Sequence, residues 1–114
     1  MEMKKIKNLK RLDDISNLQD NWNDNGAKPF SIQLIDACKE IIAKLYYQPE
    51  IFPTAANSIQ FEYEKDNGDY IEFNVYEDKI NVYQTNGQTE GRNMTLNIHA
   101  IEELSKLIND FMED

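Results

Sequence analysis

The sequence predicts an α+β fold with two N-terminal helices, an antiparallel β-meander of three or four strands, and a C-terminal helix packed on one sheet face. Two periodicities lead to this prediction. Apolar residues recur every three or four positions before residue 47 and after residue 97, which is the helical period. Between residues 58 and 85, apolar and polar residues alternate in three successive runs, which is typical of strands covered on one side. The length of 114 residues suits a single domain, residues 1–114.

Two helices are expected in the first half of the chain. The first spans residues 6–22, where apolar side chains stand at positions 6, 9, 12, 15, 18 and 22. Ser31 is suited to cap a second helix over about residues 32–47, and two prolines hold an extended connector over residues 48–57. The only cysteine, Cys38, lies in the apolar stripe of the second helix, so we expect a buried hydrophobic side chain rather than a nucleophile.

The register of the meander follows from matching its apolar faces. A two-residue loop at residues 77–78 matches the second and third runs. Between the first and second runs, a two-residue loop would mix the faces, whereas a three-residue loop at residues 66–68, with Gly68 in the left-handed conformation, matches them. The resulting apolar pairs are Tyr63 with Ile71, Phe61 with Phe73, Val75 with Ile80, and Phe73 with Val82.

The last third of the chain is expected to end in a helix. Asn86-Gly87 indicates another turn, and residues 92–96 form a candidate fourth strand. Asn97 is suited to cap a helix that continues to the C-terminus. This places His99, the only histidine, in the first turn of that helix.

The charge is strongly acidic and unevenly distributed. The formal net charge is −9, but residues 1–11 carry five cations against Glu2, a balance of +4, which leaves −13 for residues 12–114. Such a field repels phosphate backbones, so direct nucleic-acid binding is disfavoured, while a basic protein partner or simple solubility is favoured. No apolar run approaches the roughly 20 residues that span a bilayer. Without a secretory signal and with one cysteine, a cytoplasmic location and no membrane partner are expected.

Two polar groups invite a catalytic or metal-binding interpretation. Asn21, Asn23, Asn25 and Gly26 match four positions of a calcium loop, but its twelfth position falls on Ile32, which has no carboxylate, and an Asn/Gly turn explains the same residues. A second His or a Cys at zinc-site spacing does not accompany the single histidine. We therefore expect no metal, cofactor or catalytic residues, although the many carboxylates keep a small carboxylate-using enzyme as an alternative.

The polar face of the meander is the candidate protein-binding surface. In the predicted register Glu62 stands opposite Glu72. Like charges placed opposite each other destabilise a sheet by on the order of 0.3 kcal/mol. Tyrosine supplies rigid amphipathic contact area, and carboxylates attract and orient a basic partner. The alternative is an ordinary solvated sheet face. The candidate binding residues are Glu62, Glu64, Tyr70, Glu72, Asn74, Tyr76 and Tyr83.

Residues 18–31 read LQDNWNDNGAKPFS, with an Asn-Trp pair, Gly-Ala, a proline and a serine that opens a helix. This stretch resembles the signature of a family of short bacterial and phage-borne proteins of unassigned function. Residues 49–54 (PEIFPT) and 58–63 (SIQFEY) also look like this family, so the resemblance covers about residues 9–85. It implies structural roles, with Trp22 as a core plug between the helices and Gly26 and Pro29 as turn formers.

The resemblance also implies a phage or mobile-element setting, where small acidic proteins commonly act as inhibitors. The leading hypothesis is a non-enzymatic binding module of the anti-defence, anti-CRISPR-like, antitoxin or immunity type. Its partner would be a basic protein such as a nucleic-acid-handling enzyme or a toxin. The alternative is a structural or self-associating accessory protein that forms a homodimer through the same sheet face or an edge strand.

Overall fold

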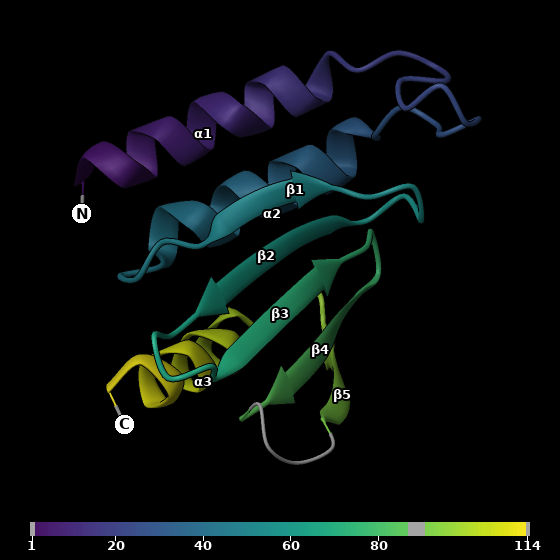
Figure 1. The fold of residues 1–114 in the computed structure, drawn as a ribbon. Coiled ribbons are helices and arrows are strands. Elements are labelled where there is room, and N and C mark those ends of the chain that lie inside the picture. The colour runs from purple at the N-terminus through teal and green to yellow at the C-terminus, as the bar shows by residue number, and fades with distance from the viewer. Residues whose placement is uncertain (1, 87–90, 114) are drawn as a thin grey trace.

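The computed structural model describes residues 2–86 and 91–113 and contains, within these ranges, three helices and one five-stranded antiparallel sheet (Figure 1). The strands follow one another across the sheet in sequence order. The predicted α+β fold is confirmed, with five strands instead of three or four. The elements are α1 (Glu2–Ser16), α2 (Ile32–Lys44), β1 (Glu50–Pro53), β2 (Ile59–Glu64), β3 (Tyr70–Val75), β4 (Lys79–Thr85), β5 (Arg92–Asn97) and α3 (Ile101–Glu113).

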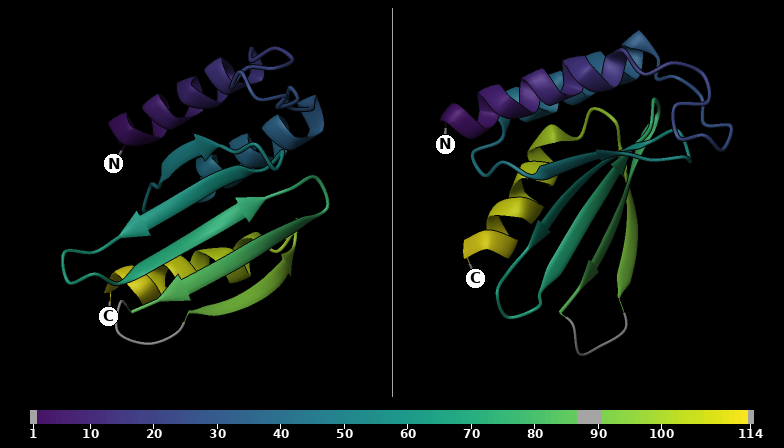
Figure 2. Two further views of the ribbon diagram at one scale, coloured as in Figure 1. Left: turned by 45° about the vertical axis from the view of Figure 1, so that its right-hand side comes forward. Right: turned by 45° about the horizontal axis from the view of Figure 1, so that its top comes forward.

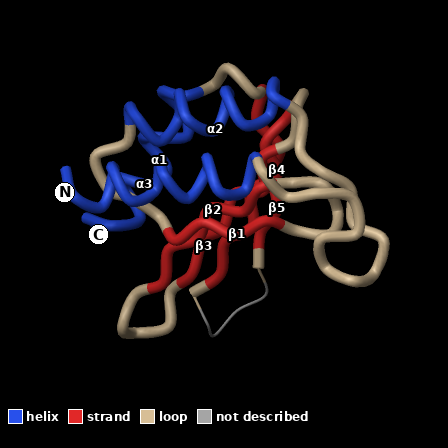
Figure 3. The backbone as a smooth tube through the Cα atoms, turned by 90° about the horizontal axis from the view of Figure 1, so that it is seen from above, coloured by secondary structure: helices blue, strands red, loops and turns tan. Residues whose placement is uncertain are grey.

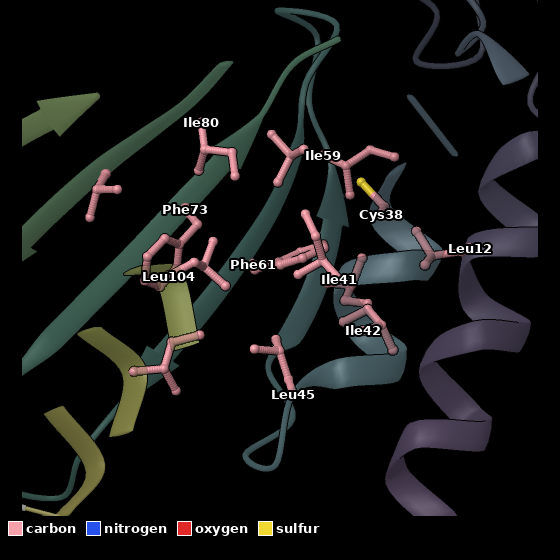
Figure 4. Packing of buried hydrophobic residues seen from close by; sticks show 14 of the residues in the cluster. Leu12, Cys38, Ile41, Ile42, Leu45, Ile59, Phe61, Phe73, Ile80 and Leu104 are labelled. Carbon is pink, nitrogen blue, oxygen red and sulfur yellow. The ribbon is translucent and has the colours of Figure 1, made fainter. Parts of the chain in front are cut away.

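The three helices lie on one face of the sheet and leave the other face uncovered (Figures 2 and 3). Between the helices and the sheet is the hydrophobic core, to which every strand contributes its inward-pointing residues. In Figure 4, Ile41 of α2 points toward Phe61 of β2, and Leu104 of α3 lies beside Phe73 of β3. Cys38 belongs to this core with no exposed surface, as predicted.

The register of the meander agrees with the prediction. Tyr63 pairs with Ile71, and Val75 pairs with Ile80. At the first turn, the N–H of Lys65 donates to the carbonyl of Asp69 at 2.9 Å, so three residues form the loop. Gly68 has a φ of +95°, in the left-handed region that glycine adopts without strain.

The fifth strand, β1, corrects the predicted connector over residues 48–57. Its Ile51 pairs with Phe61 of β2. The strand was missed because it has only four residues and follows Pro49 closely. Pro53 is compatible with it, because β1 is an edge strand and proline lacks the N–H that an inner strand would need.

The helix bounds also differ from the prediction. α1 ends at Ser16 instead of residue 22, and α2 ends at Lys44 instead of residue 47. The N-cap of α2 is confirmed, since the N–H of Leu34 donates to Ser31 Oγ at 3.1 Å. Asn97 ends β5 and does not cap α3 directly.

His99 therefore lies in a turn before α3, and not in its first turn. The side chain of Asn97 shapes this turn, because its Oδ1 accepts from the N–H of His99 at 2.8 Å. Of the predicted Asn86-Gly87 turn, Gly87 lies outside the described residues.

Candidate interaction surface

The uncovered side of the sheet carries the predicted binding residues, and we call this side the outer face. On it Glu62 stands opposite Glu72, which in turn stands opposite Tyr83. All three are half-buried. Glu62 and Glu72 each lie between two inward-pointing core residues of their strands, and Tyr83 follows the core residue Val82. The ladder also places the exposed Glu64 opposite Tyr70, and Asn74 opposite Asn81.

Tyr76 lies at the margin of this surface, one residue beyond the end of β3. Its N–H closes the β3–β4 turn by donating to the carbonyl of Lys79 at 2.9 Å. The ammonium nitrogen of Lys79 is 5.3 Å from the centre of the Tyr76 ring, within the range of a cation–π contact. Tyr76 is therefore already engaged by a cation of its own chain.

The outer face extends onto β1, which the sequence interpretation did not include. Glu50 pairs with Glu62, so Glu50, Glu62 and Glu72 form one row across three strands. Phe52 pairs with Gln60 in the next row and is 40% exposed. Had residues 50–53 been predicted as a strand, Glu50 and Phe52 would have been included in the candidate binding surface.

A hydrogen-bond network holds the two inner carboxylates of this row in place. The Tyr70 hydroxyl lies 2.8 Å from Glu72 Oε1 and 3.0 Å from Glu62 Oε2, and so donates into the space between them. Asn74 Nδ2 donates to Glu72 Oε2 at 2.7 Å, and Gln60 Nε2 donates to Glu62 Oε2 at 2.9 Å. These donors offset the repulsion expected between opposed carboxylates.

The network continues from β3 to the turn between β1 and β2. Ser58 Oγ donates to Asn74 Oδ1 at 3.2 Å and lies 2.7 Å from Thr54 Oγ1. Ser58 is buried, with 1% of its surface exposed. The polar side chains of the outer face are thus linked to a buried side chain, and these hydrogen bonds limit the conformational entropy that a partner would have to remove.

Tyr83 is positioned by the close approach of a backbone. A Cβ atom at Gly91 would collide with the Tyr83 ring, so the ring lies directly against the glycine. Gly91 therefore does more than form a turn: it gives the aromatic ring on β4 its place beside Glu72.

Two tyrosines of the sheet have raised pKa values for different reasons. Burial raises the pKa of Tyr70, and the hydrogen bonds and negative charges of Glu72 and Glu62 raise it further. Burial alone raises the pKa of Tyr63, which lies on the opposite, helix-covered face. Both phenols therefore stay protonated in the folded protein at pH values where an unfolded tyrosine ionises.

Because the tyrosine pKa values are higher in the folded than in the unfolded protein, we expect a loss of stability in alkali. The ordinary tyrosine pKa is 10.0, so the stabilisation is complete below pH 10 and falls as the pH rises above it. For Tyr63, the free energy of unfolding should fall by about 1.4 kcal/mol per pH unit above pH 10. Urea unfolding at a series of pH values measures this slope. In Tyr63→Phe the slope should be smaller by about 1.4 kcal/mol per pH unit, which is the contribution of one ionising group. An unchanged slope in Tyr63→Phe would contradict the assignment.

The Asn-rich segment between α1 and α2 forms a turn that uses its own side chains. Asn21 Oδ1 accepts from the N–H of Gly26 at 2.6 Å, and Asn23 Oδ1 accepts from the N–H of Asn25 at 2.9 Å and of Ala27 at 3.0 Å. Backbone N–H groups thus bond to two of the side-chain oxygens that the calcium interpretation required, which favours the alternative of an Asn/Gly turn.

Trp22 packs against the core from this turn. It is half-buried, its Nε1 donates to the carbonyl of Lys28 at 2.9 Å, and its ring lies 6.0 Å from that of Phe30. Trp22 therefore anchors the connector between the helices.

The one histidine lies in a depression between α2 and α3. Glu40, His99, Glu102 and Glu103, all exposed, line it together with Lys44, Ala100 and Ile101. Within residues 2–86 and 91–113, no group of three or more His, Cys, Asp or Glu side chains is arranged to hold a metal ion.

No helix in the described part of the chain has the length and apolar character needed to cross a bilayer. Comparison with protein-family models, curated proteins and solved structures finds no match to this chain.

Proposed function

We propose that this chain is a non-enzymatic protein-binding module whose outer face engages a basic protein surface. The observation that carries the proposal is the row of Glu50, Glu62 and Glu72, set beside Tyr70 and Tyr83 on a sheet face that no helix covers. An uncovered sheet face of this kind is accessible to a macromolecule.

The chemistry of the row suits arginine and lysine side chains. Glu62 and Glu72 are held by hydrogen bonds, so a cationic partner group meets carboxylates that need little reordering. Tyr83 offers a ring beside Glu72 on which a guanidinium can stack. The net charge of −9 adds long-range attraction that raises the association rate of a basic partner.

The sequence resemblance favours a particular class of partner. In a phage or mobile-element setting, a small acidic inhibitor would block a nucleic-acid-handling enzyme or neutralise a toxin by covering the basic surface that such a protein uses. The module would then act as an anti-defence factor, an antitoxin or an immunity protein. Direct binding of this chain to nucleic acid is disfavoured by the same negative field.

Two charge-matched double variants test the proposal. Glu62→Gln/Glu72→Gln removes two charges from the outer face, and Glu102→Gln/Glu103→Gln removes two exposed charges from the first turn of α3. Immobilised wild type is used to capture proteins from a bacterial lysate, and the proteins that it retains are identified and purified. Their affinities for wild type and both variants are then measured by calorimetry over a range of salt concentrations.

The expected partner is basic and binds wild type and the α3 variant alike. Binding to the outer-face variant should be weaker by about tenfold or more, which corresponds to about 1.4 kcal/mol. Affinity for wild type should fall steeply with added salt, because exposed charges are screened. Equal binding to the two double variants, or binding indifferent to salt, would remove the proposal.

A further inference from the structure

The two edges of the sheet differ in which backbone groups they leave free. In an antiparallel ladder, alternate residues direct their N–H and C=O groups to opposite neighbours. The N–H of Lys65 donates to the carbonyl of Asp69, so residue 65 and every second residue before it in β2 bond to β3. Residues 60 and 62 of β2 therefore bond to β1. Consequently Ile51 and Pro53 of β1 point their backbone groups outward.

The β1 edge is closed by α1. Arg11 Nε donates to the outward carbonyl of Ile51 at 2.7 Å, and Asn8 Nδ2 donates to the carbonyl of Pro49 at 3.0 Å. Pro53 has no N–H to offer. Proline, a short strand and a covering helix are the devices by which natural sheets prevent an edge from pairing.

The β5 edge has none of these devices. The N–H of Tyr76 donates to the carbonyl of Lys79, so residue 79 and every second residue after it in β4 bond to β3. Residues 80, 82 and 84 of β4 therefore bond to β5. Asn93, Thr95 and Asn97 therefore direct their N–H and C=O groups away from the sheet. Within the described ranges no hydrogen bond reaches the backbone of Asn93 or Thr95, and no element lies beyond β5 in Figure 2.

The β5 strand is also the part of the sheet at which two acidic molecules can meet. From Gly91 to Ile101 there is no Asp or Glu, and Arg92 adds a positive charge. On its helix-facing side the strand carries Met94, which is 48% exposed, and Leu96, which is 9% exposed. Self-association through the outer face would instead bring together two rows of carboxylates.

We propose that β5 pairs with β5 of a second copy of this chain, antiparallel and about a two-fold axis at Thr95. Thr95 then exchanges N–H···O=C bonds with its own counterpart. Asn93 pairs with Asn97 of the second copy, whose carbonyl accepts from the N–H of its own Ala100 at 3.0 Å and has a second lone pair for Asn93. Met94 lies opposite Leu96 of the second copy, so the exposed methionine is covered by an apolar side chain. Every outward residue of β5 is used in this register.

The dimer closes after two copies, because the β1 edges at its ends are blocked by α1. Since the two-fold axis is perpendicular to the sheet, the helices of both copies lie on one side and both outer faces on the other. The inference does not depend on the proposed function, but it would give a partner two acidic faces in one plane.

Sedimentation equilibrium of the full chain over a wide concentration range tests the dimer with two variants of exposed Thr95. Both Thr95→Lys and Thr95→Val lose the 3.2 Å bond from Thr95 Oγ1 to Asn81 Oδ1, and both keep the backbone N–H. Thr95→Lys places two ammonium groups at the axis. Wild type and Thr95→Val should rise from 13.4 kDa toward twice that mass, while Thr95→Lys should stay at 13.4 kDa.

A cross-link locates the axis independently. Oxidised Thr95→Cys should form a covalent dimer, whereas wild type should not, because its one cysteine, Cys38, has no exposed surface. Far-UV circular dichroism establishes that each variant is folded. A wild type that stays monomeric, a folded Thr95→Lys that dimerises like wild type, or a folded Thr95→Cys that does not cross-link would each overturn the inference.

Discussion

Phe61→Ala is expected to lower the free energy of unfolding by about 3–5 kcal/mol, the largest effect of any single substitution considered for this chain. Phe61 has no exposed surface and lies between Ile51 of β1 and Phe73 of β3. Figure 4 shows Ile41 of α2 directed at it, so its removal leaves a cavity that neither the sheet nor the helix can fill without moving. Urea unfolding followed by circular dichroism measures the change.

Phe52→Ala is the matched control for this substitution. Phe52 is the same residue type on the neighbouring strand but is 40% exposed on the outer face, near the Arg11 guanidinium. Its removal should cost about 1 kcal/mol or less, because the side chain is already partly exposed and its truncation leaves no enclosed cavity. Similar losses for the two variants would contradict the placement of the core on the helix side of the sheet.

Gln48→Ala is expected to cost about 2–4 kcal/mol, because it removes three hydrogen bonds that are made in buried surroundings. Gln48 is 5% exposed, and its Nε2 donates to the carbonyls of Ile42 and Leu45 at 2.9 Å each, at the end of α2. Its Oε1 accepts from Nδ2 of Asn8, which is 7% exposed, at 3.0 Å. The side chain thus joins α1, α2 and the start of β1.

A double-mutant cycle with Asn8→Ala separates the energy of the Asn8–Gln48 hydrogen bond from the loss of packing at each residue. Because the two amides share a hydrogen bond, the double variant should lose less stability than the two single variants added together. Gln60→Ala, which removes an amide from the half-buried outer face, is expected to cost about 1 kcal/mol or less. Additive losses, or a Gln48→Ala protein as stable as wild type, would contradict the role assigned to this residue.

The meander could be derived from sequence because its strands alternate strictly and its loops leave one register in which apolar faces match. Glu62, Glu72 and Tyr83 share a surface for the same reason. The β1 strand could not be derived, because a four-residue edge strand that follows Pro49 and ends at Pro53 is too short to show a readable alternation.

The geometry of the outer face was equally beyond the sequence. The ladder placed Tyr70 opposite Glu64, yet the hydroxyl reaches diagonally to Glu62 and along its own strand to Glu72. Side-chain reach of this kind depends on rotamers, and alternation specifies only the face on which a residue lies. α1 ends at Ser16, before the predicted bound, and the Asn-rich segment that follows satisfies part of its backbone with its own side chains in a turn that the helical period does not reveal.

The central claim is that the outer face binds a basic protein. Its most direct test is to map, on the backbone amides of this chain, where the basic partner from the capture experiment binds. Spectra of isotope-labelled chain are recorded during titration with this partner, and shifted resonances are assigned to residues. The account predicts that the largest shifts fall on the outer face of β2, β3 and β4, around Glu62, Tyr70 and Glu72. A footprint centred on α1, α2 or α3, with these residues unchanged, would contradict it.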